Sequence, residues 1–177
     1  MIGYRGCGKT SVARLLAEKL GWDWIDADVE IEKTAGKTIA EIFQDDGEPC
    51  FRDWEQKVIQ QLLERSNLVL ASGGGSVMNA ETRQAMQQAG SVVWLKAPAT
   101  LLAARIEADA LSRSQRPSLT GKSIGDEVAD VLKIREPVYE QAASLIIDTE
   151  QLSIDEVSQK IEQELARLNQ EDKDRQS

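Results

Sequence analysis

The stretch that decides the fold lies at the start of the chain and consists of Gly3-Tyr4-Arg5-Gly6-Cys7-Gly8-Lys9-Thr10. It matches the pattern G-x-x-x-x-G-K-[ST] in full, and apolar residues at helical spacing follow it. Glycines allow such a loop to wrap closely, so that backbone N–H groups point inward beside the positive end of the next helix. The stretch therefore predicts a loop that binds phosphate groups. The alternative is a glycine-rich turn that precedes a helix by chance, which is expected about once in a hundred such stretches.

The side chains of this loop have expected roles of their own. Lys9 would reach the outer phosphates of a nucleotide and take part in catalysis, and Thr10 would ligate magnesium. The expected contacts with ATP in and just after the loop are Gly6, Cys7, Gly8, Lys9, Thr10 and Ser11. ATP and Mg²⁺ are thus the predicted cofactors.

Only Met1 and Ile2 precede the loop, although such a loop normally follows a buried strand. A truncated strand would leave its two neighbours without a shared ladder and expose unpaired backbone, which costs several kcal/mol. We therefore expect the native gene product to begin a few residues upstream of Met1. An in-frame stop immediately before Met1, with no alternative start, would contradict this hypothesis.

Strands and helices alternate along the rest of the chain. The expected helices span residues 9–20, 29–34, 39–44, 51–65, 80–89, 99–108, 126–139 and 154–168, and the expected strands span 22–25, 68–72, 92–95 and 144–147. Asn79 and Ser153 are expected helix caps, and Gly21 is an expected helix stop. Alternation of this kind predicts crossover units, and hence an α/β fold with a parallel sheet between two layers of helices.

Two segments fall outside this alternation. Residues 110–125 are polar and show no sustained period, so we expect them to form a mobile lid. Residues 169–177 contain no apolar side chain, and we expect this tail to be disordered. Because no linker or internal repeat is present, the chain is predicted to form one domain over residues 1–168.

The composition excludes several classes of function. The 30 acidic and 21 basic residues give a net charge of −9, which repels the phosphate backbone of nucleic acids. The chain has no histidine, and Cys7 and Cys50 lie far apart, so a zinc site and a histidine base are excluded. It shows neither an apolar run of membrane-spanning length nor a secretory signal. We expect a soluble cytoplasmic protein without nucleic-acid or membrane partners.

Asp26 and Asp28 lie at the end of an expected strand. Ligands of parallel sheets collect outside the carboxyl ends of the strands. Since residues two apart share one side of an extended chain, both carboxylates are expected to face the phosphate loop. Asp26 would order the water shell of magnesium, and Asp28 would accept a proton from a substrate hydroxyl. A solvated turn or a helix cap is the alternative.

Two arginines could bind an anionic group of a second substrate. Arg52 follows an aromatic residue at the start of a helix and could fork onto a carboxylate. A surface ion pair of Arg52 with Glu48 or Glu55 is the commoner explanation of such a pattern. Arg135 offers a second cation for the same carboxylate.

Glycines and a further arginine could complete the site. Gly73, Gly74 and Gly75 follow an expected strand and would let the backbone approach a ligand, although a plain turn explains them as well. Arg116 lies in the expected lid and could close over the transferring phosphate, which would make it both a catalytic residue and an ATP contact.

Taken together, these motifs resemble the shikimate kinase family. The resemblance rests on Gly8-Lys9-Thr10, Asp26 with Asp28, Gly47-Glu48 with Phe51-Arg52 and Glu55, Gly73-Gly74-Gly75, Arg116-Pro117, and Arg135 with Pro137 and Tyr139, in that order. It implies a P-loop NTPase-type three-layer sandwich whose five parallel strands follow the order 2-3-1-4-5. It also implies a monomer that uses ATP to convert shikimate into shikimate 3-phosphate, on the pathway to chorismate and the aromatic amino acids.

The resemblance assigns roles to the candidate residues around the substrate. Asp28 would hold the ring hydroxyls, Arg52 and Arg135 the carboxylate, and the backbone at Gly74 another hydroxyl. Arg116 would touch ATP from the lid. In the same pattern, Thr10 binds magnesium directly and Asp26 binds it through water.

Two other functions remain open at this point. A gluconate-kinase-like enzyme would share the loop and the lid, but two separated arginines would leave a buried charge unpaired beside a neutral sugar. A nucleotide-binding module without catalysis would keep the fold, but the presence of Lys9, Asp28 and both arginines argues against lost activity.

Overall fold

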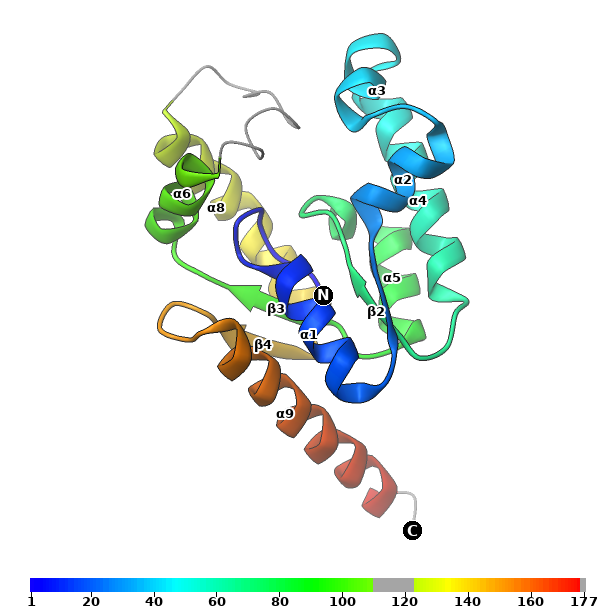
Figure 1. Ribbon diagram of the computed structural model, residues 1–177, viewed down its shortest axis with the longest axis vertical. Helices are drawn as coiled ribbons and strands as arrows, with labels where there is room; N and C mark the ends of the chain where they lie inside the picture. The colour runs from blue at the N-terminus through cyan, green and yellow to red at the C-terminus, as the bar shows by residue number, and fades with distance from the viewer. Residues whose placement is uncertain (110–122, 176–177) are drawn as a thin grey trace.

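The computed structural model of the chain describes residues 1–109 and 123–175 (Figure 1). The helices are α1 (Lys9–Leu20), α2 (Ala27–Ala35), α3 (Ile39–Asp45), α4 (Gly47–Leu63), α5 (Ala80–Ala89), α6 (Ala99–Ala108), α8 (Ile124–Ala142) and α9 (Ile154–Arg175), with the short 3-10 helix η1 (Ser76–Met78). The strands are β1 (Asp23–Asp26), β2 (Leu68–Ala71), β3 (Val93–Lys96) and β4 (Leu145–Asp148). Most of the predicted lid, including Arg116, lies outside the described residues.

The described strands form two parallel pairs, which confirms the predicted α/β class. β1 pairs with β2, with Ile25 opposite Leu70, and β3 pairs with β4, with Trp94 opposite Ile146. The predicted order of five strands in one sheet is not seen as such and stays a prediction.

Met1 and Ile2 join the two strand pairs. The amide of Ile2 donates to the carbonyl of Val93 at 2.8 Å, and the carbonyl of Ile2 accepts from Leu95 at 3.0 Å. On the other side, the carbonyl of Met1 accepts from the amide of Ser72 at 3.1 Å. The chain therefore enters the phosphate loop directly from a position between β2 and β3.

Helices cover the strands on both sides. In Figure 1, α1 and α9 pass in front of the strands; α1 packs against α9 and against β1 and β2. On the other side, α8 packs against α5 and α6. Apolar residues at helical spacing on these helices meet apolar residues of the strands in one buried cluster that includes Ile2, Leu16 and Tyr139. This core holds the loops at the carboxyl ends of the strands in place.

Helix caps account for most of the observed boundaries. Gly21 ends α1 in the left-handed conformation, with φ of 66°, as predicted. The side chain of Asn79 accepts from the amides of Glu81 and Thr82, which confirms it as the cap of α5. Ser153 and Glu156 exchange hydrogen bonds of 3.3 and 2.8 Å at the start of α9 and form a capping box.

The expected end of the last helix at residue 168 is wrong, and the expected disorder of residues 169–177 stays a prediction. Helix α9 continues to Arg175, beyond the expected end at residue 168. The seven added residues include Glu, Gln, Lys and Arg, which favour helix, and no Gly or Pro.

None of the described helices is both long enough and apolar enough to cross a membrane.

Candidate active site

The loop before α1 has the shape that phosphate binding requires. Gly6 and Gly8 have positive φ angles of 81° and 94°, which side chains rarely adopt. Gly3 has a φ of 135°, and a Cβ atom there would lie 2.7 Å from the carbonyl oxygen of Leu95. Gly8 stands at the cap position of α1 and provides no capping side chain, so the first amides of the helix remain available to an anion.

The ammonium of Lys9 lies over its own loop. Its Nζ atom donates to the carbonyl oxygens of Gly3 and Tyr4 at 2.9 and 3.0 Å and lies 3.7 Å from the sulfur of Cys7. These are weak partners for a full charge, and bound phosphates would compete for the same donor. Lys9 is therefore held beside the space in front of the α1 N-terminus.

Thr10 and Asp26 are brought together by the first turn of α1 and the end of β1. The Thr10 hydroxyl donates to Oδ2 of Asp26 at 2.6 Å. Two oxygen donors side by side next to a phosphate loop suit Mg²⁺, which takes one or two protein oxygens and keeps several waters. The chemistry of this donor pair therefore fits the predicted magnesium site. Among the described residues, no group of three or more aspartate, glutamate or cysteine side chains is placed to hold a metal ion.

Asp26 and Asp28 were expected to share an extended strand, but Asp28 lies outside it. Asp26 ends β1 and caps α2, because its Oδ1 accepts from the amide of Asp28 at 3.0 Å. Asp28 therefore lies in the first turn of a helix, and the argument from strand alternation is wrong. The alternative of a helix cap applies to Asp26, which uses its two oxygens for the cap and for Thr10.

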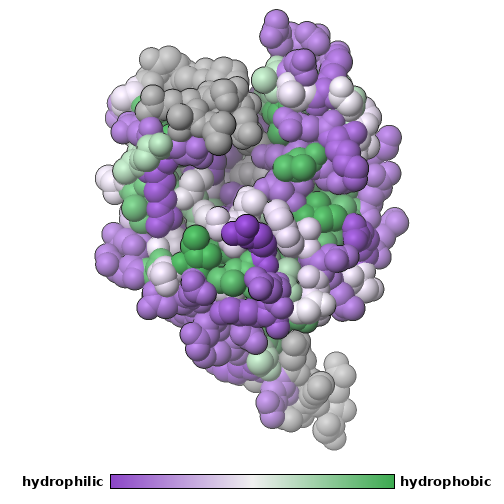
Figure 2. Space-filling model, viewed as in Figure 1, coloured by the Kyte–Doolittle hydropathy of each residue, from purple (hydrophilic) through white to green (hydrophobic). Residues whose placement is uncertain are grey.

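A cavity of about 440 Å³ opens between α4, η1, α5 and α8. Its lining residues are Glu48, Arg52, Glu55, Gln56, Gly75, Ser76, Met78, Asn79, Thr82, Val131, Ile134 and Arg135. Figure 2 shows that this face of the molecule is hollowed between the α6 and α8 side and the α2 to α4 side. Of the predicted substrate residues, the cavity thus brings Arg52, Arg135 and Gly75 together, while Asp28, Gly73 and Gly74 are not in its lining.

Arg52 makes ion pairs with Glu48 and Glu55, which were the alternative to a role in ligand binding, and it also lines the cavity. Its Nη1 atom donates to Glu55 at 2.7 Å, and its Nε and Nη2 atoms donate to Glu48 at 3.2 and 2.8 Å. Burial opposes the charge of Arg52, but Glu55 and Glu48 outweigh burial and raise its pKa. Since guanidinium carries five N–H donors, three bonds leave capacity for a ligand carboxylate.

Gly74 and Gly75 form a buried turn that approaches Arg135 and Arg52. A Cβ atom on Gly75 would lie 2.7 Å from Nη1 of Arg52, and one on Gly74 would lie 3.5 Å from Nη1 of Arg135. A Cβ atom on Gly74 would also lie 3.0 Å from the carbonyl oxygen of Gly3. The glycines therefore allow the substrate arginines and the phosphate loop to approach one backbone turn.

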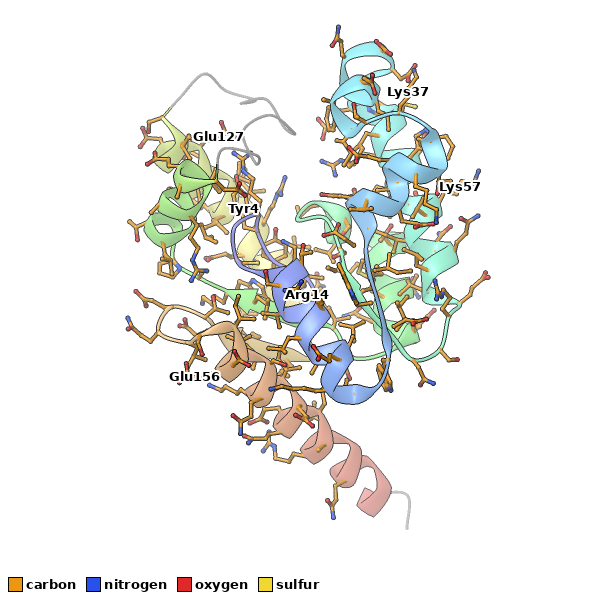
Figure 3. All side chains as sticks on the ribbon, in the orientation of Figure 1. Tyr4, Arg14, Lys37, Lys57, Glu127 and Glu156 are labelled. Atoms are coloured by element: carbon orange, nitrogen blue, oxygen red, sulfur yellow. The ribbon has the colours of Figure 1, made fainter. Side chains whose placement is uncertain are left out.

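Contacts between the loop and α8 connect the phosphate site with the cavity. Figure 3 places Tyr4 in the loop beside α8, which carries Glu127. The guanidinium of Arg135 lies over the Tyr4 ring, 5.7 Å from its centre, and Arg5 pairs with Glu127 at 3.7 Å. From α6, Arg105 donates to the carbonyl oxygen of Gly6 at 3.3 Å.

Sequence reasoning missed several residues of the cavity. Gln56, Asn79 and Thr82 line its polar side, and Met78, Val131 and Ile134 its apolar side. The pairing of Arg52 with both Glu48 and Glu55 was available from their spacing of four and three residues on one helix. No comparable pattern links η1 and α5 to α8, because these lining residues lie far apart in the sequence, from Ser76 to Thr82 on one side and from Val131 to Arg135 on the other.

Solved structures resemble this chain over most of its length. A shikimate kinase from Acinetobacter baumannii in complex with shikimate matches with a TM-score of 0.87 and 40% identity, covering 94% of this chain and 90% of that one. A gluconokinase from Sinorhizobium meliloti matches with a TM-score of 0.59 and 18% identity, over 94% of this chain and 90% of that one, and shares the fold alone. Fold and loop define the class, a P-loop phosphotransferase.

A family model described as shikimate kinase matches residues 5–166. The shikimate kinase of Rhodopirellula baltica is 44% identical over 157 residues, which are 89% of this chain and 84% of that protein. The chain belongs to the shikimate kinase family, whose members are ATP-dependent phosphotransferases that act on an alcohol group. The predicted family, enzyme class and function are confirmed.

Proposed function

We propose that this chain transfers the γ-phosphate of ATP to the 3-hydroxyl of shikimate and releases shikimate 3-phosphate and ADP. The observation that carries the proposal is the cavity in which Arg52 and Arg135 line one space beside the glycine turn. Two guanidinium groups on one cavity suit a ligand with a carboxylate, because planar arginine forks bind carboxylates with defined geometry. The solved relative that contains shikimate has 40% identity with this chain.

The donor nucleotide would occupy the loop before α1. The α1 amides and the Lys9 ammonium would surround its phosphates, with Gly6 to Ser11 as the contacts. The present bonds of Lys9 to Gly3 and Tyr4 would then give way to charge-assisted bonds with phosphate oxygens. Phosphoryl transfer needs mainly positioning and neutralised charge, and both come from this arrangement.

Mg²⁺ would be held by Thr10 directly and by Asp26 through water. When bound, it supplies positive charge to the phosphate oxygens. The short bond between Thr10 and Asp26 keeps both oxygens at one place before any ligand arrives. Asp26 also caps α2, so the same carboxylate ties the magnesium position to the helix that carries Asp28.

Asp28 would accept the proton of the attacking hydroxyl, and Arg116 would contact ATP as the γ-phosphate moves. Asp28 lies two residues beyond the carboxylate that contacts Thr10, so its helix starts beside the phosphate loop. A carboxylate within reach of the hydroxyl suits this role of general base. The backbone at Gly73 to Gly75 would bind the remaining polar groups of the ring.

The proposal also includes a cytoplasmic location, a monomer, and no nucleic-acid or membrane partner. The net charge of −9 supports the absence of a nucleic-acid partner.

A coupled assay of ADP release tests the proposed function. With MgATP, we expect ADP release that depends on shikimate and that gluconate does not support. Release with gluconate would favour the sugar-kinase alternative. Binding of MgATP without release of ADP for either acceptor would favour a nucleotide-binding module without catalysis.

Arg52→Lys should chiefly weaken shikimate binding. Lysine keeps the positive charge, but a point charge cannot replace the fork that contacts Glu48, Glu55 and the ligand together. We expect the KM for shikimate to rise about tenfold, with the KM for MgATP little changed, in steady-state kinetics. An unchanged KM for shikimate would remove Arg52 from the carboxylate site.

Gly75→Ala should disturb the binding of shikimate by Arg52, because the added methyl group would meet the Arg52 guanidinium. The φ of Gly75 is −101°, which alanine adopts freely, so the added Cβ displaces the Arg52 guanidinium rather than the backbone. We expect a rise of about tenfold in the KM for shikimate, since one well-placed polar contact accounts for about this factor, while the melting temperature stays nearly constant. Gly90→Ala is the matched control, because nothing lies within 4 Å of the added Cβ. Equal effects of both variants would contradict the assignment.

A further inference from the structure

Tyr139 is fully buried below the glycine turn and has no role in the function described so far. It lies in α8, one turn after Arg135, with 0% of its surface exposed. Its ring packs against Trp94 of β3, with ring centres 5.6 Å apart. A buried tyrosine hydroxyl needs a polar partner, so its partner identifies the group that this hydroxyl holds in place.

The Tyr139 hydroxyl donates a hydrogen bond to the carbonyl oxygen of Gly74. Burial raises the pKa of Tyr139 to about 12, which the charge of Arg135 partly opposes. The hydroxyl therefore keeps its proton and remains a donor at every pH at which the enzyme is expected to work. The bond joins residues 65 positions apart and fixes the glycine turn to α8.

The bond also determines where the next amide points. The carbonyl of Gly74 and the N–H of Gly75 belong to one planar trans peptide group, so they point in opposite directions. With the carbonyl held by Tyr139, the N–H of Gly75 faces away from the buried tyrosine. Gly75 lines the cavity, and its amide donates to none of the residues that the structure describes.

Both substrate arginines lie around this same peptide group. The Nη1 atom of Arg52 is 2.7 Å from the position of a Cβ atom on Gly75. The Nη1 atom of Arg135 and the Tyr139 hydroxyl are each 3.5 Å from the position of a Cβ atom on Gly74. A rotation of this peptide group would therefore change the spacing between the Gly75 amide and the guanidinium groups of Arg52 and Arg135.

We infer that Tyr139 is a positioning residue that holds the Gly74–Gly75 peptide so that the Gly75 amide and both arginines face the substrate carboxylate together. This inference rests on the proposed function and adds a residue that acts only through the groups that touch the substrate. The Tyr139 hydroxyl donates to the glycine turn that lines the acceptor side, so we expect its larger effect on shikimate binding.

Tyr139→Phe tests the inference, because it removes the hydroxyl and keeps the ring that packs against Trp94. We expect the KM for shikimate to rise about fivefold or more, the usual effect of one lost hydrogen bond, while the KM for MgATP stays within about twofold. The matched control is Ser144→Ala, which removes a hydroxyl that bonds the Val92 backbone at 2.9 and 3.2 Å before the start of β3. It should leave both constants within about twofold of the original chain.

Two kinetic outcomes would overturn the inference. One is a KM for shikimate in Tyr139→Phe that stays within about twofold of the original chain. The other is a general effect, seen either as an equal rise of both constants in Tyr139→Phe or as the same change in Ser144→Ala, which would indicate destabilisation.

A measurement on the chain without ligands separates this inference from the proposed function. The chain has 12 glycines, so ¹⁵N-glycine labelling gives a simple amide spectrum in which Gly75→Ala identifies the Gly75 signal. Tyr139→Phe should move the Gly75 signal, and Ser144→Ala should not. An unmoved signal overturns the positioning role even if shikimate is phosphorylated. A moved signal without shikimate-dependent ADP release supports the positioning of the peptide and contradicts the proposed function.

Discussion

Asp28→Asn lowers the shikimate-dependent turnover at least about a hundredfold, because an amide cannot accept the proton of the attacking hydroxyl. The substitution keeps the size of the side chain. The backbone N–H of residue 28 still donates to the Asp26 carboxylate, so helix α2 keeps its cap. Binding of MgATP should persist, since the loop and the pair of Thr10 and Asp26 are untouched. Steady-state turnover and calorimetric titration with MgATP measure the two effects separately.

Asp155→Asn is the control for this experiment. Asp155 is an exposed carboxylate in the first turn of α9, on an element that the site does not use. The control should turn over at the original rate. Near-normal turnover of Asp28→Asn would remove Asp28 from the role of proton acceptor.

Lys9→Met lowers kcat by about a hundredfold to a thousandfold, which is the usual effect of removing one donor that stabilises charge in the transition state. Methionine keeps the unbranched shape of the side chain and loses the ammonium that lies 2.9 Å from the Gly3 carbonyl. The phosphates of ATP would then be bound by loop amides without the nearest positive charge. Single-turnover measurements with ATP and shikimate report this loss directly.

Lys19→Met is the matched control, since Lys19 lies exposed in the last turn of the same helix. It should leave kcat unchanged. Thermal unfolding of both variants separates a catalytic effect from the loss of the two carbonyl contacts of Lys9. A Lys9→Met enzyme that keeps both its stability and its kcat would contradict phosphate transfer at this loop.

Local chemistry made much of the fold predictable. The helices over Lys9–Leu20 and Ala99–Ala108 have the predicted bounds, because both show clear apolar periodicity; Gly21 ends the first, and Pro98 precedes the second. The phosphate loop was predictable for the same reason, since its glycines and its lysine act within eight consecutive residues. The end of the last helix was not predictable from apolar periodicity, because residues 169–175 combine helix-favouring types with no apolar residue.

The site was predictable from the sequence only in part. The resemblance to the shikimate kinase family grouped Arg52, Arg135 and the glycine turn into one substrate site; their residue types alone left ion pairs and a plain turn as alternatives. The position of Asp28 could not be derived from strand alternation, since Asp26 ends the strand by capping the next helix. The bond from Tyr139 to Gly74 joins distant segments and leaves no local pattern.

Phosphorus NMR of the reaction mixture is the most direct test of the central claim, that the loop and the two-arginine cavity phosphorylate shikimate at one hydroxyl. With this chain, MgATP and shikimate, we predict a new phosphate monoester signal that is coupled to the ring proton at carbon 3 and grows in step with ADP. A spectrum in which ADP forms without a shikimate phosphate, or in which the phosphate lies on another hydroxyl, would contradict the account.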